Sequence, residues 1–263
     1  MKKPAQKIKV SVHKFSSCDG CQLAFLNSVG ELLKLSDWID IVHFAEAGPC
    51  NPDEPVNIAF IEGSISTEED IERLKAIRQS ANKLVSIGAC ATNGGLQALR
   101  NMASHDDWVK AIYAKPEYIT TLDNSTAISQ HVRVDYELQG CPINSQQVFG
   151  AIQSWLNGHE PEKQFDTVCM ECKRKGNTCV MVTHQKPCMG PVTRIGCGAI
   201  CPSFNRECYG CYGPAELCNT ESLATGFEYY GLSDHDIGNR FHGINSHSKE
   251  FLIAGQKHRN DND

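Results

Sequence analysis

Apolar and polar positions along the first 160 residues predict a repeating β-α chain. Ile8, Val10 and Val12 alternate with polar residues, as in a strand, and an apolar helix is expected over residues 23–33. Ser66 and Glu69 form the pattern of a capping box at the start of a later helix. The remaining strands are predicted at residues 40–44, 56–61, 84–89 and 132–138, and the remaining helices at residues 71–77, 96–99, 108–113 and 145–156. This order indicates an α/β domain with a doubly wound parallel sheet.

Four cysteines follow three of the predicted strands. Cys18 and Cys21 lie between the first strand and the first helix, Cys90 ends the fourth strand, and Cys141 follows the fifth in a Gly-Cys-Pro turn. Because the carboxyl ends of parallel strands lie at one edge of a sheet, where such folds bind their ligands, we expect the four thiols to converge. Four thiols at one edge predict a metal site.

Glu62 ends the third strand, on the same predicted edge. A carboxylate there could pass protons between a buried metal centre and solvent if its pKa is raised. The alternative is a structural carboxylate that accepts local backbone N–H bonds or bonds from a partner chain.

The sequence changes character after Pro161. Nine cysteines lie between Cys169 and Cys218, and the only apolar stretch there is residues 180–182. Such a segment cannot build an ordinary core, so metal clusters are expected to stabilise it. From Ser233 onward the chain is polar, and we expect a loosely ordered arm or a partner contact that carries His235, His242 and His247. The predicted division is residues 1–160, 161–232 and 233–263.

Composition and charge exclude some classes of function. A formal net charge of −6 argues against a nucleic-acid footprint, and no run approaches the roughly 18 apolar residues of a membrane helix. The first residues resemble neither a signal peptide nor a twin-arginine signal. We therefore expect a cytoplasmic location, where the 14 cysteines bind metal as thiolates rather than form disulfides.

Three CxxC pairs begin at Cys18, Cys169 and Cys208. Paired CxxC motifs also bind zinc, which is the main alternative to iron and sulfur. The run from Cys197 to Pro202 is similar to the end of bacterial ferredoxin motifs, which favours iron–sulfur clusters. Twelve ligands for three [4Fe-4S] clusters are expected: Cys18, Cys21, Cys90, Cys141, Cys169, Cys172, Cys179, Cys188, Cys197, Cys201, Cys208 and Cys211. Spacing alone does not pair the last eight into two sets, and Cys218 could replace one of them, whereas Cys50 is expected to be unligated.

Several motifs together resemble the small subunit of nickel-iron hydrogenases. They are Ser17–Gln22, Phe60–Glu69, Gly88–Ala91 and Gly140–Pro142, followed by Pro187–Thr193 and Cys208–Cys211, which are close to the delta chain of cytoplasmic sulfhydrogenases linked to NAD(P). The resemblance covers roughly residues 7–215. It implies a flavodoxin-like domain followed by a small ferredoxin-like iron–sulfur domain. It also implies a proximal [4Fe-4S] cluster on Cys18, Cys21, Cys90 and Cys141, and two more on the later cysteines.

By this resemblance the chain is an electron-transfer subunit with no active site of its own. Its implied partners are a large subunit that holds the nickel-iron centre, and flavin and iron–sulfur subunits of the diaphorase type that exchange electrons with NAD(P). A deazaflavin-reducing or heterodisulfide-coupled hydrogenase is an alternative within the family. A zinc-stabilised binding module or a hydrogen sensor is the alternative from another class.

Overall fold

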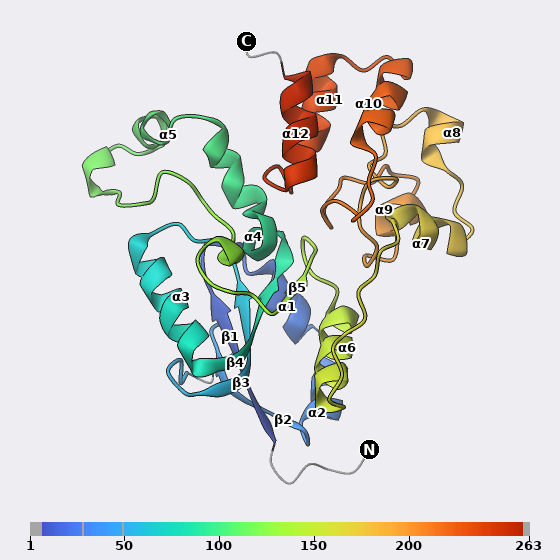
Figure 1. The fold of residues 1–263 in the computed structure, drawn as a ribbon. Helices are drawn as coiled ribbons and strands as arrows, with labels where there is room; N and C mark the ends of the chain where they lie inside the picture. Colours follow the sequence, from blue (N-terminus) through green and yellow to red (C-terminus); the bar gives the residue numbers. More distant parts are fainter. Residues whose placement is uncertain (1–6, 28, 49, 260–263) are drawn as a thin grey trace. The chain divides into compact units, whose positions relative to one another are not determined.

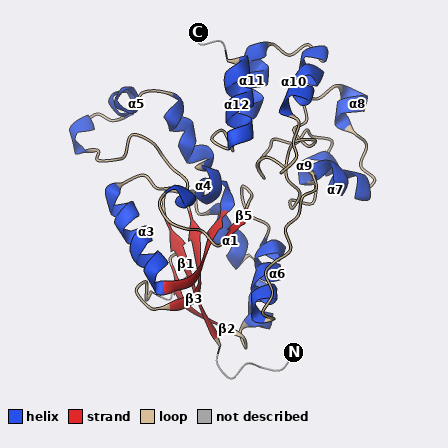
Figure 2. Ribbon diagram, viewed as in Figure 1, coloured by secondary structure: helices blue, strands red, loops and turns tan. Residues whose placement is uncertain are grey.

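The computed structural model describes residues 7–27, 29–48 and 50–259. The chain divides into two compact units, Met1–Pro161 and Glu162–Asp263. In the first unit, five parallel strands form one sheet in the order β2-β1-β3-β4-β5 (Figures 1 and 2). This order is the flavodoxin-like order, and it makes the unit an α/β fold. The strands are β1 (Ile8–Lys14), β2 (Ile39–Phe44), β3 (Val56–Glu62), β4 (Ala81–Ile87) and β5 (Tyr136–Leu138).

The strand register brings the carboxyl ends of β1, β3, β4 and β5 to the same level. Lys14 of β1 is paired with Glu62 of β3, Glu62 with Ile87 of β4, and Ile87 with Leu138 of β5. These four residues end their strands. The segments that immediately follow β1, β4 and β5 therefore begin at the same edge, and these segments contain Cys18, Cys21, Cys90 and Cys141.

Successive side chains of β3 point to opposite faces of the sheet and contribute to the core on each face. Ile58 and Phe60 pack in one cluster with Phe25 of α1 (Gly20–Leu26) and with α6 (Ser145–Leu156), whereas Ala59 and Ile61 pack in another with α3 (Glu68–Ser80). Figure 1 shows α3 on one side of the sheet and α1 and α6 on the other. The connections hold the short helices α2 (Val29–Leu35), α4 (Gly88–Asn93), η1 (Gly95–Met102), α5 (His105–Ile112), η2 (Pro116–Tyr118) and η3 (Ile128–Gln130).

Some local predictions for this unit are wrong. The helix expected over residues 23–33 is two helices, α1 and α2, and Leu33 is 66% exposed. The side chains of Val29 and Leu32 lie outside the described part. The cap of α3 is Thr67, not Ser66, because the Thr67 side chain accepts the Asp70 backbone N–H and Asp70 in turn accepts that of Ser66. The fifth strand is also shorter than expected.

The second unit contains short helices and irregular loops. Its helices are α7 (Val168–Arg174), α8 (Val180–His184), α9 (Ile200–Ser203), α10 (Thr220–Tyr229), α11 (Asp234–Phe241) and α12 (Lys249–His258). Isolated bridges join Thr193 to Pro214 and Thr167 to Arg194. Cysteines contribute to its buried cluster, since Cys188 and Cys208 pack with Met189 and Val192.

The expectation of a loosely ordered arm from Ser233 is wrong. Ile237 and Phe241 of α11 and Phe251 of α12 are almost completely buried and belong to the same cluster as Cys188 and Cys208. The Ser233 side chain caps α11 by accepting the Asp236 backbone N–H. The apolar positions in this region are few, but they recur at helical spacing, which a count of polar residues conceals. Within the described ranges, no helix has the length and apolar composition needed to cross a membrane.

Candidate metal centres

The first group of thiols lies at the carboxyl edge of the sheet. Cys18 and Cys21 are in the loop after β1 and at the start of α1, Cys90 is in α4, and Cys141 follows β5. Cys21 interacts electrostatically with Cys90 and Cys141, Cys90 with Cys18 and Cys141, and Cys141 with Cys18. The structure therefore brings these four cysteines together, from segments that are far apart in the sequence.

The loop that carries Cys18 and Cys21 is fixed by polar contacts. Asp19 adopts a left-handed conformation with φ of 65°, and its carboxylate pairs with Lys14 at 2.7 Å. The Ser17 hydroxyl donates to the same carboxylate at 3.2 Å. These contacts hold the turn between β1 and α1 in the conformation that presents both cysteines to one side.

Two glycines leave space for the sulfur atoms. Gly88 has φ of 86°, and a Cβ at this position would overlap Cys21 Sγ. Gly95 has φ of 56°, and a Cβ there would lie 2.7 Å from Cys90 Sγ. Side chains at either position would be both strained and in collision with a thiol.

Backbone N–H groups are directed at the sulfur atoms. Ile143 donates to Cys21, and Leu96 and Gln97 donate to Cys90. Burial nevertheless raises the pKa of Cys21, with Glu62 as the next cause, and raises the pKa of Cys90 to about 11. Without a metal, the thiols of Cys21 and Cys90 are therefore protonated at neutral pH, and metal binding would replace the proton. A group of sulfur ligands with N–H donors suits an iron–sulfur cluster.

Glu62 is 2% exposed and lies beside this group. Its carboxylate accepts the Cys21 backbone N–H at 2.9 Å and the Gln22 side-chain N–H at 2.8 Å. Burial raises the pKa of Glu62, although both hydrogen bonds oppose the shift. The residue thus fixes the first turn of α1, and a raised pKa is also what a proton carrier requires.

A second group of thiols comprises Cys169, Cys172, Cys179 and Cys188. Cys169 interacts electrostatically with the other three, and Cys188 interacts with Cys172 and Cys179. Burial raises the pKa of Cys169 to about 11 and also raises that of Cys188. The backbone N–H groups of Gly190 and Cys208 donate to Cys188 sulfur.

The remaining four predicted ligands follow in the chain. Cys197 interacts with Cys201, and Cys208 with Cys211. Burial raises the pKa of both Cys197 and Cys208, and backbone N–H groups of Ala199 and Ile200 donate to Cys197. Cys188 also interacts with Cys208, so the pair of Cys208 and Cys211 adjoins the second group.

Glu171 is a positioning residue that the sequence patterns did not reveal. Its carboxylate accepts the backbone N–H groups of Gly196 and Ala199, each at 3.1 Å, and so ties α7 to the loop that carries Cys197 and Cys201. The arrangement is similar to that of Glu62 and Cys21. A signal was present in the sequence, since Glu171 lies inside the pair formed by Cys169 and Cys172.

Cys50 and Cys218 are placed differently from the other twelve. Cys50 is exposed, and its backbone forms an isolated bridge with His43. Burial raises the pKa of Cys218, with Glu250 as the next cause. The charged groups that act on Cys218 are Glu250 and Arg194, and no other cysteine is among the causes of its shift. Cys21, Cys90, Cys169 and Cys188, in contrast, each act with other predicted ligands.

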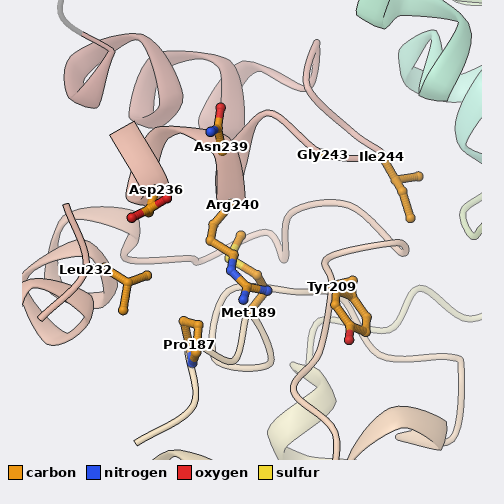
Figure 3. A pocket seen from close by; sticks show the side chains of 9 residues that line it. All are labelled: Pro187, Met189, Tyr209, Leu232, Asp236, Asn239, Arg240, Gly243 and Ile244. Carbon is orange, nitrogen blue, oxygen red and sulfur yellow. The ribbon is translucent and has the colours of Figure 1, made fainter. Parts of the chain in front are cut away.

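A cavity of about 630 Å³ lies in the second unit beside two of the cysteines. Its walls include Met189 and Tyr209, the neighbours of Cys188 and Cys208, and three polar residues of α11 (Figure 3). Arg240, one of these, pairs with Glu207 at 3.4 Å. The segment that was expected to be an arm therefore covers the cysteine-bearing loops.

The chain matches known hydrogenase subunits. The model of the family described as NADH ubiquinone oxidoreductase, 20 Kd subunit, matches residues 18–155. Sulfhydrogenase 2 subunit delta of Pyrococcus furiosus is 32% identical over 79% of this chain and 87% of the relative. NAD-reducing hydrogenase HoxS subunit delta of Cupriavidus necator is 29% identical over 58% of this chain and 80% of the relative. One subunit of the F420-non-reducing hydrogenase of Methanothermobacter marburgensis is 29% identical over 80% of each chain.

Solved structures agree with this relationship. An NAD+-reducing [NiFe]-hydrogenase in the H2-reduced state has a chain that is 29% identical, with a TM-score of 0.55, over 61% of this chain and 97% of that one. The Ni-Fe-Se hydrogenase of Desulfomicrobium baculatum, at 16% identity and a TM-score of 0.57 over 84% of this chain and 99% of that one, shares the fold. The chain therefore belongs to the family of NADH ubiquinone oxidoreductase 20 Kd subunits, as a small subunit of the nickel-iron hydrogenase type.

Proposed function

We propose that this chain holds three [4Fe-4S] clusters and relays electrons between the nickel-iron centre of a large subunit and an NAD(P)-reducing module. The observation that carries the proposal is the gathering of four cysteines at the edge of the sheet and of eight more within the second unit. One set lies in the first unit, at the edge of the sheet. In the second unit, Cys169, Cys172, Cys179 and Cys188 act on one another, and Cys197 with Cys201 and Cys208 with Cys211 form two pairs. We assign these two pairs to the third cluster.

A [4Fe-4S] cluster supplies one-electron transfer, and its reduction potential responds to hydrogen bonds at the sulfur atoms and to solvent exposure. The residues of this chain determine both the hydrogen bonds at sulfur and its exposure to solvent. Backbone N–H groups donate to Cys21, Cys90, Cys188 and Cys197. Burial keeps Cys208 out of water, at 4% exposure. These donors stabilise negative charge on sulfur before any electron arrives.

Glu62 is assigned a second role, as a proton carrier beside the proximal set. Oxidation of hydrogen releases protons as well as electrons, and a buried carboxyl whose pKa is raised by burial can accept and release them. Its two hydrogen bonds, from Cys21 and Gln22, keep the carboxylate in place while it does so.

The acceptor is proposed to be NAD(P), reached through flavin and iron–sulfur subunits of the diaphorase type. The NAD-reducing hydrogenase of Cupriavidus necator is the relative that favours this acceptor. A second candidate is an acceptor other than NAD(P), because the relative from Methanothermobacter marburgensis is named an F420-non-reducing hydrogenase and its name includes no NAD(P). The absence of disulfides among all 14 cysteines is compatible with a reducing cytoplasm, which is the proposed location.

Metal and sulfide analysis of the anaerobically purified complex tests the proposal. About twelve iron and about twelve acid-labile sulfur atoms are expected in this chain, with broad absorption that decreases when hydrogen is added. Stoichiometric zinc with only about four iron atoms would contradict three clusters and support the zinc-stabilised alternative. Reduction of NAD+ and of NADP+ by hydrogen in the same preparation decides between the two candidate acceptors.

A further inference from the structure

One stretch of the second unit differs in charge from the rest of the chain. Residues 173–206 contain no Asp or Glu, although the whole chain has a formal net charge of −6. The stretch contains six cations, Lys173, Arg174, Lys175, Lys186, Arg194 and Arg206. A basic segment inside an acidic protein produces a local positive field, which attracts acidic partners.

The fold gathers three of these cations around α9. The Lys175 Nζ atom lies 3.4 Å from the position that a Cβ on Gly198 would occupy. Lys186 Nζ donates to the backbone oxygen of Asn205 at 2.7 Å. Arg206 follows α9 directly, and its guanidinium donates to the Tyr209 hydroxyl at 2.8 Å.

No carboxylate of the described residues forms an ion pair with these three cations. The two nearest acidic side chains in the sequence are already engaged. Glu171 accepts backbone N–H groups, and Glu207 pairs with Arg240. Glu207 also acts electrostatically on Lys186 and Arg206, but this one carboxylate is shared with Arg240. The charge beside α9 is therefore only partly neutralised within the described part of this unit and stays positive.

Two bulky apolar side chains of the same segment are exposed. Ile200 is 58% exposed and Phe204 is 74% exposed. We call Lys175, Lys186, Ile200, Phe204 and Arg206 together the α9 face. A small apolar centre with a charged surround is typical of protein–protein interfaces, and weak electron-transfer encounters have the smallest of these interfaces.

The α9 face adjoins a predicted cluster ligand. Cys201 lies within α9, between Ile200 and the exposed Phe204, and it interacts electrostatically with Arg206. A protein that docks on this face would therefore be close to the third set of cysteines. Cations that only balanced the charge of the thiolates would not explain two exposed apolar side chains beside them.

We propose that the α9 face is the docking surface for a soluble, acidic ferredoxin-type electron carrier. The inference rests on the proposed function, because it requires a cluster on Cys197, Cys201, Cys208 and Cys211. Oxidation of one H2 yields two protons and two electrons, and each electron reduces one oxidised carrier molecule without making or breaking a covalent bond. The small apolar centre and the dominance of charge favour this transient occupant over a permanently bound subunit.

Hydrogen-driven reduction of a purified acidic 2[4Fe-4S] ferredoxin by the assembled complex tests the proposal. The variant Lys175→Glu/Arg206→Glu is expected to raise KM for ferredoxin by about tenfold or more at low ionic strength, and the difference should shrink as salt is added. Reduction of a small viologen dye and the iron content should not change. The matched control is Lys163→Glu/Lys249→Glu, which makes the same change in charge at exposed positions of this unit and should keep the parental KM.

Phe204→Ala provides a second variant that leaves the charge unchanged. It should raise KM for ferredoxin severalfold at every ionic strength, because it removes one apolar contact and no charge. An unchanged KM in both α9-face variants with full iron content overturns the proposal. Loss of another subunit from the charge-reversed complex, or loss of binding to anionic lipid vesicles with unchanged ferredoxin kinetics, also overturns it. If the proposed function itself is wrong, the result differs: the iron–sulfur absorption of the parental complex does not decrease when hydrogen is added.

Discussion

The carboxylate of Glu62 accepts the backbone N–H of Cys21 at 2.9 Å, which joins the end of β3 to the first turn of α1. The same carboxylate accepts the Gln22 side chain. One residue therefore fixes the position of a predicted cluster ligand, and it is also the buried carboxyl whose pKa is raised by burial. Substitution can separate these two roles.

Glu62→Gln should retain the cluster and slow proton transfer. The amide oxygen can still accept the Cys21 N–H, but the amide cannot exchange a proton as a carboxyl does. We expect the parental iron content and a fall of about 100-fold in hydrogen–deuterium exchange by the assembled complex. Unchanged exchange would exclude the proton role, whereas loss of iron would show that the carboxylate acts only by positioning Cys21.

Gly88→Ala should remove the proximal cluster selectively. The new Cβ would overlap Cys21 Sγ, and φ of 86° is unfavourable for alanine. Iron content should fall from about twelve to about eight atoms per chain. Gly30→Ala is the matched control, because a Cβ at Gly30 meets nothing within 4 Å. Equal iron in the two variants would contradict a metal site at this edge of the sheet.

Cys208→Ser should stop electron delivery and spare hydrogen activation. Serine is a weaker ligand for iron than thiolate, and Cys208 is buried in the second unit. Hydrogen–deuterium exchange, which needs no electron transfer through the later clusters, should persist, while reduction of the physiological acceptor falls by at least about tenfold. Cys18→Ser, in contrast, should impair reduction of every acceptor.

Iron content and subunit composition must be measured for both cysteine variants, because a lost cluster can unfold its unit. Cys218→Ser is the control and should keep about twelve iron atoms. An intact Cys208→Ser complex that lacks one cluster and still reduces the acceptor at the parental rate would show that electrons leave by another route.

His13 should make the first unit sensitive to acid. Burial, followed by His43 and Arg73, lowers the pKa of His13 to about 3, from 6.5. Because the folded pKa is below the unfolded one, the stabilisation is complete above pH 6.5 and is lost as pH falls towards 3. The free energy of unfolding should drop by about 2 kcal/mol between about pH 7.5 and about pH 5.

Unfolding of the apoprotein by urea at several pH values measures this dependence. His13→Gln should have a smaller loss of stability on acidification, because the variant cannot titrate at this position. The exposed His159 provides the comparison, since His159→Gln should follow the parental curve. Identical pH dependence in all three proteins would contradict the assignment to His13.

The sequence predicts much of this fold because the signals are local. Strand β3 is almost continuously apolar, and α6 ends at Leu156, before Asn157, as its pattern predicts, so residue order alone locates both elements. Convergence of Cys18, Cys21, Cys90 and Cys141 also followed from the rule that parallel strands share one carboxyl edge.

Other features depend on tertiary contacts that no local pattern reports. The helices α11 and α12 are polar overall, and only three large side chains, Ile237, Phe241 and Phe251, secure them to the cysteine-bearing loops. Glu171 resembles any exposed helical glutamate in the sequence, and its role depends on two backbone N–H groups from a distant loop. Grouping of the later cysteines likewise required the positions of the loops.

The strand order of the first unit has a consequence for biogenesis. The first two proximal cysteines follow β1, near the start of the unit, and the last follows β5, near its end, with β3 and β4 between these strands in the sheet. All four parallel strands must be paired before the four thiols meet, and such non-local pairings form slowly. If these thiols hold the proposed cluster, delivery of iron and sulfide to them is a late event in maturation, which can proceed only on a sheet that is already assembled.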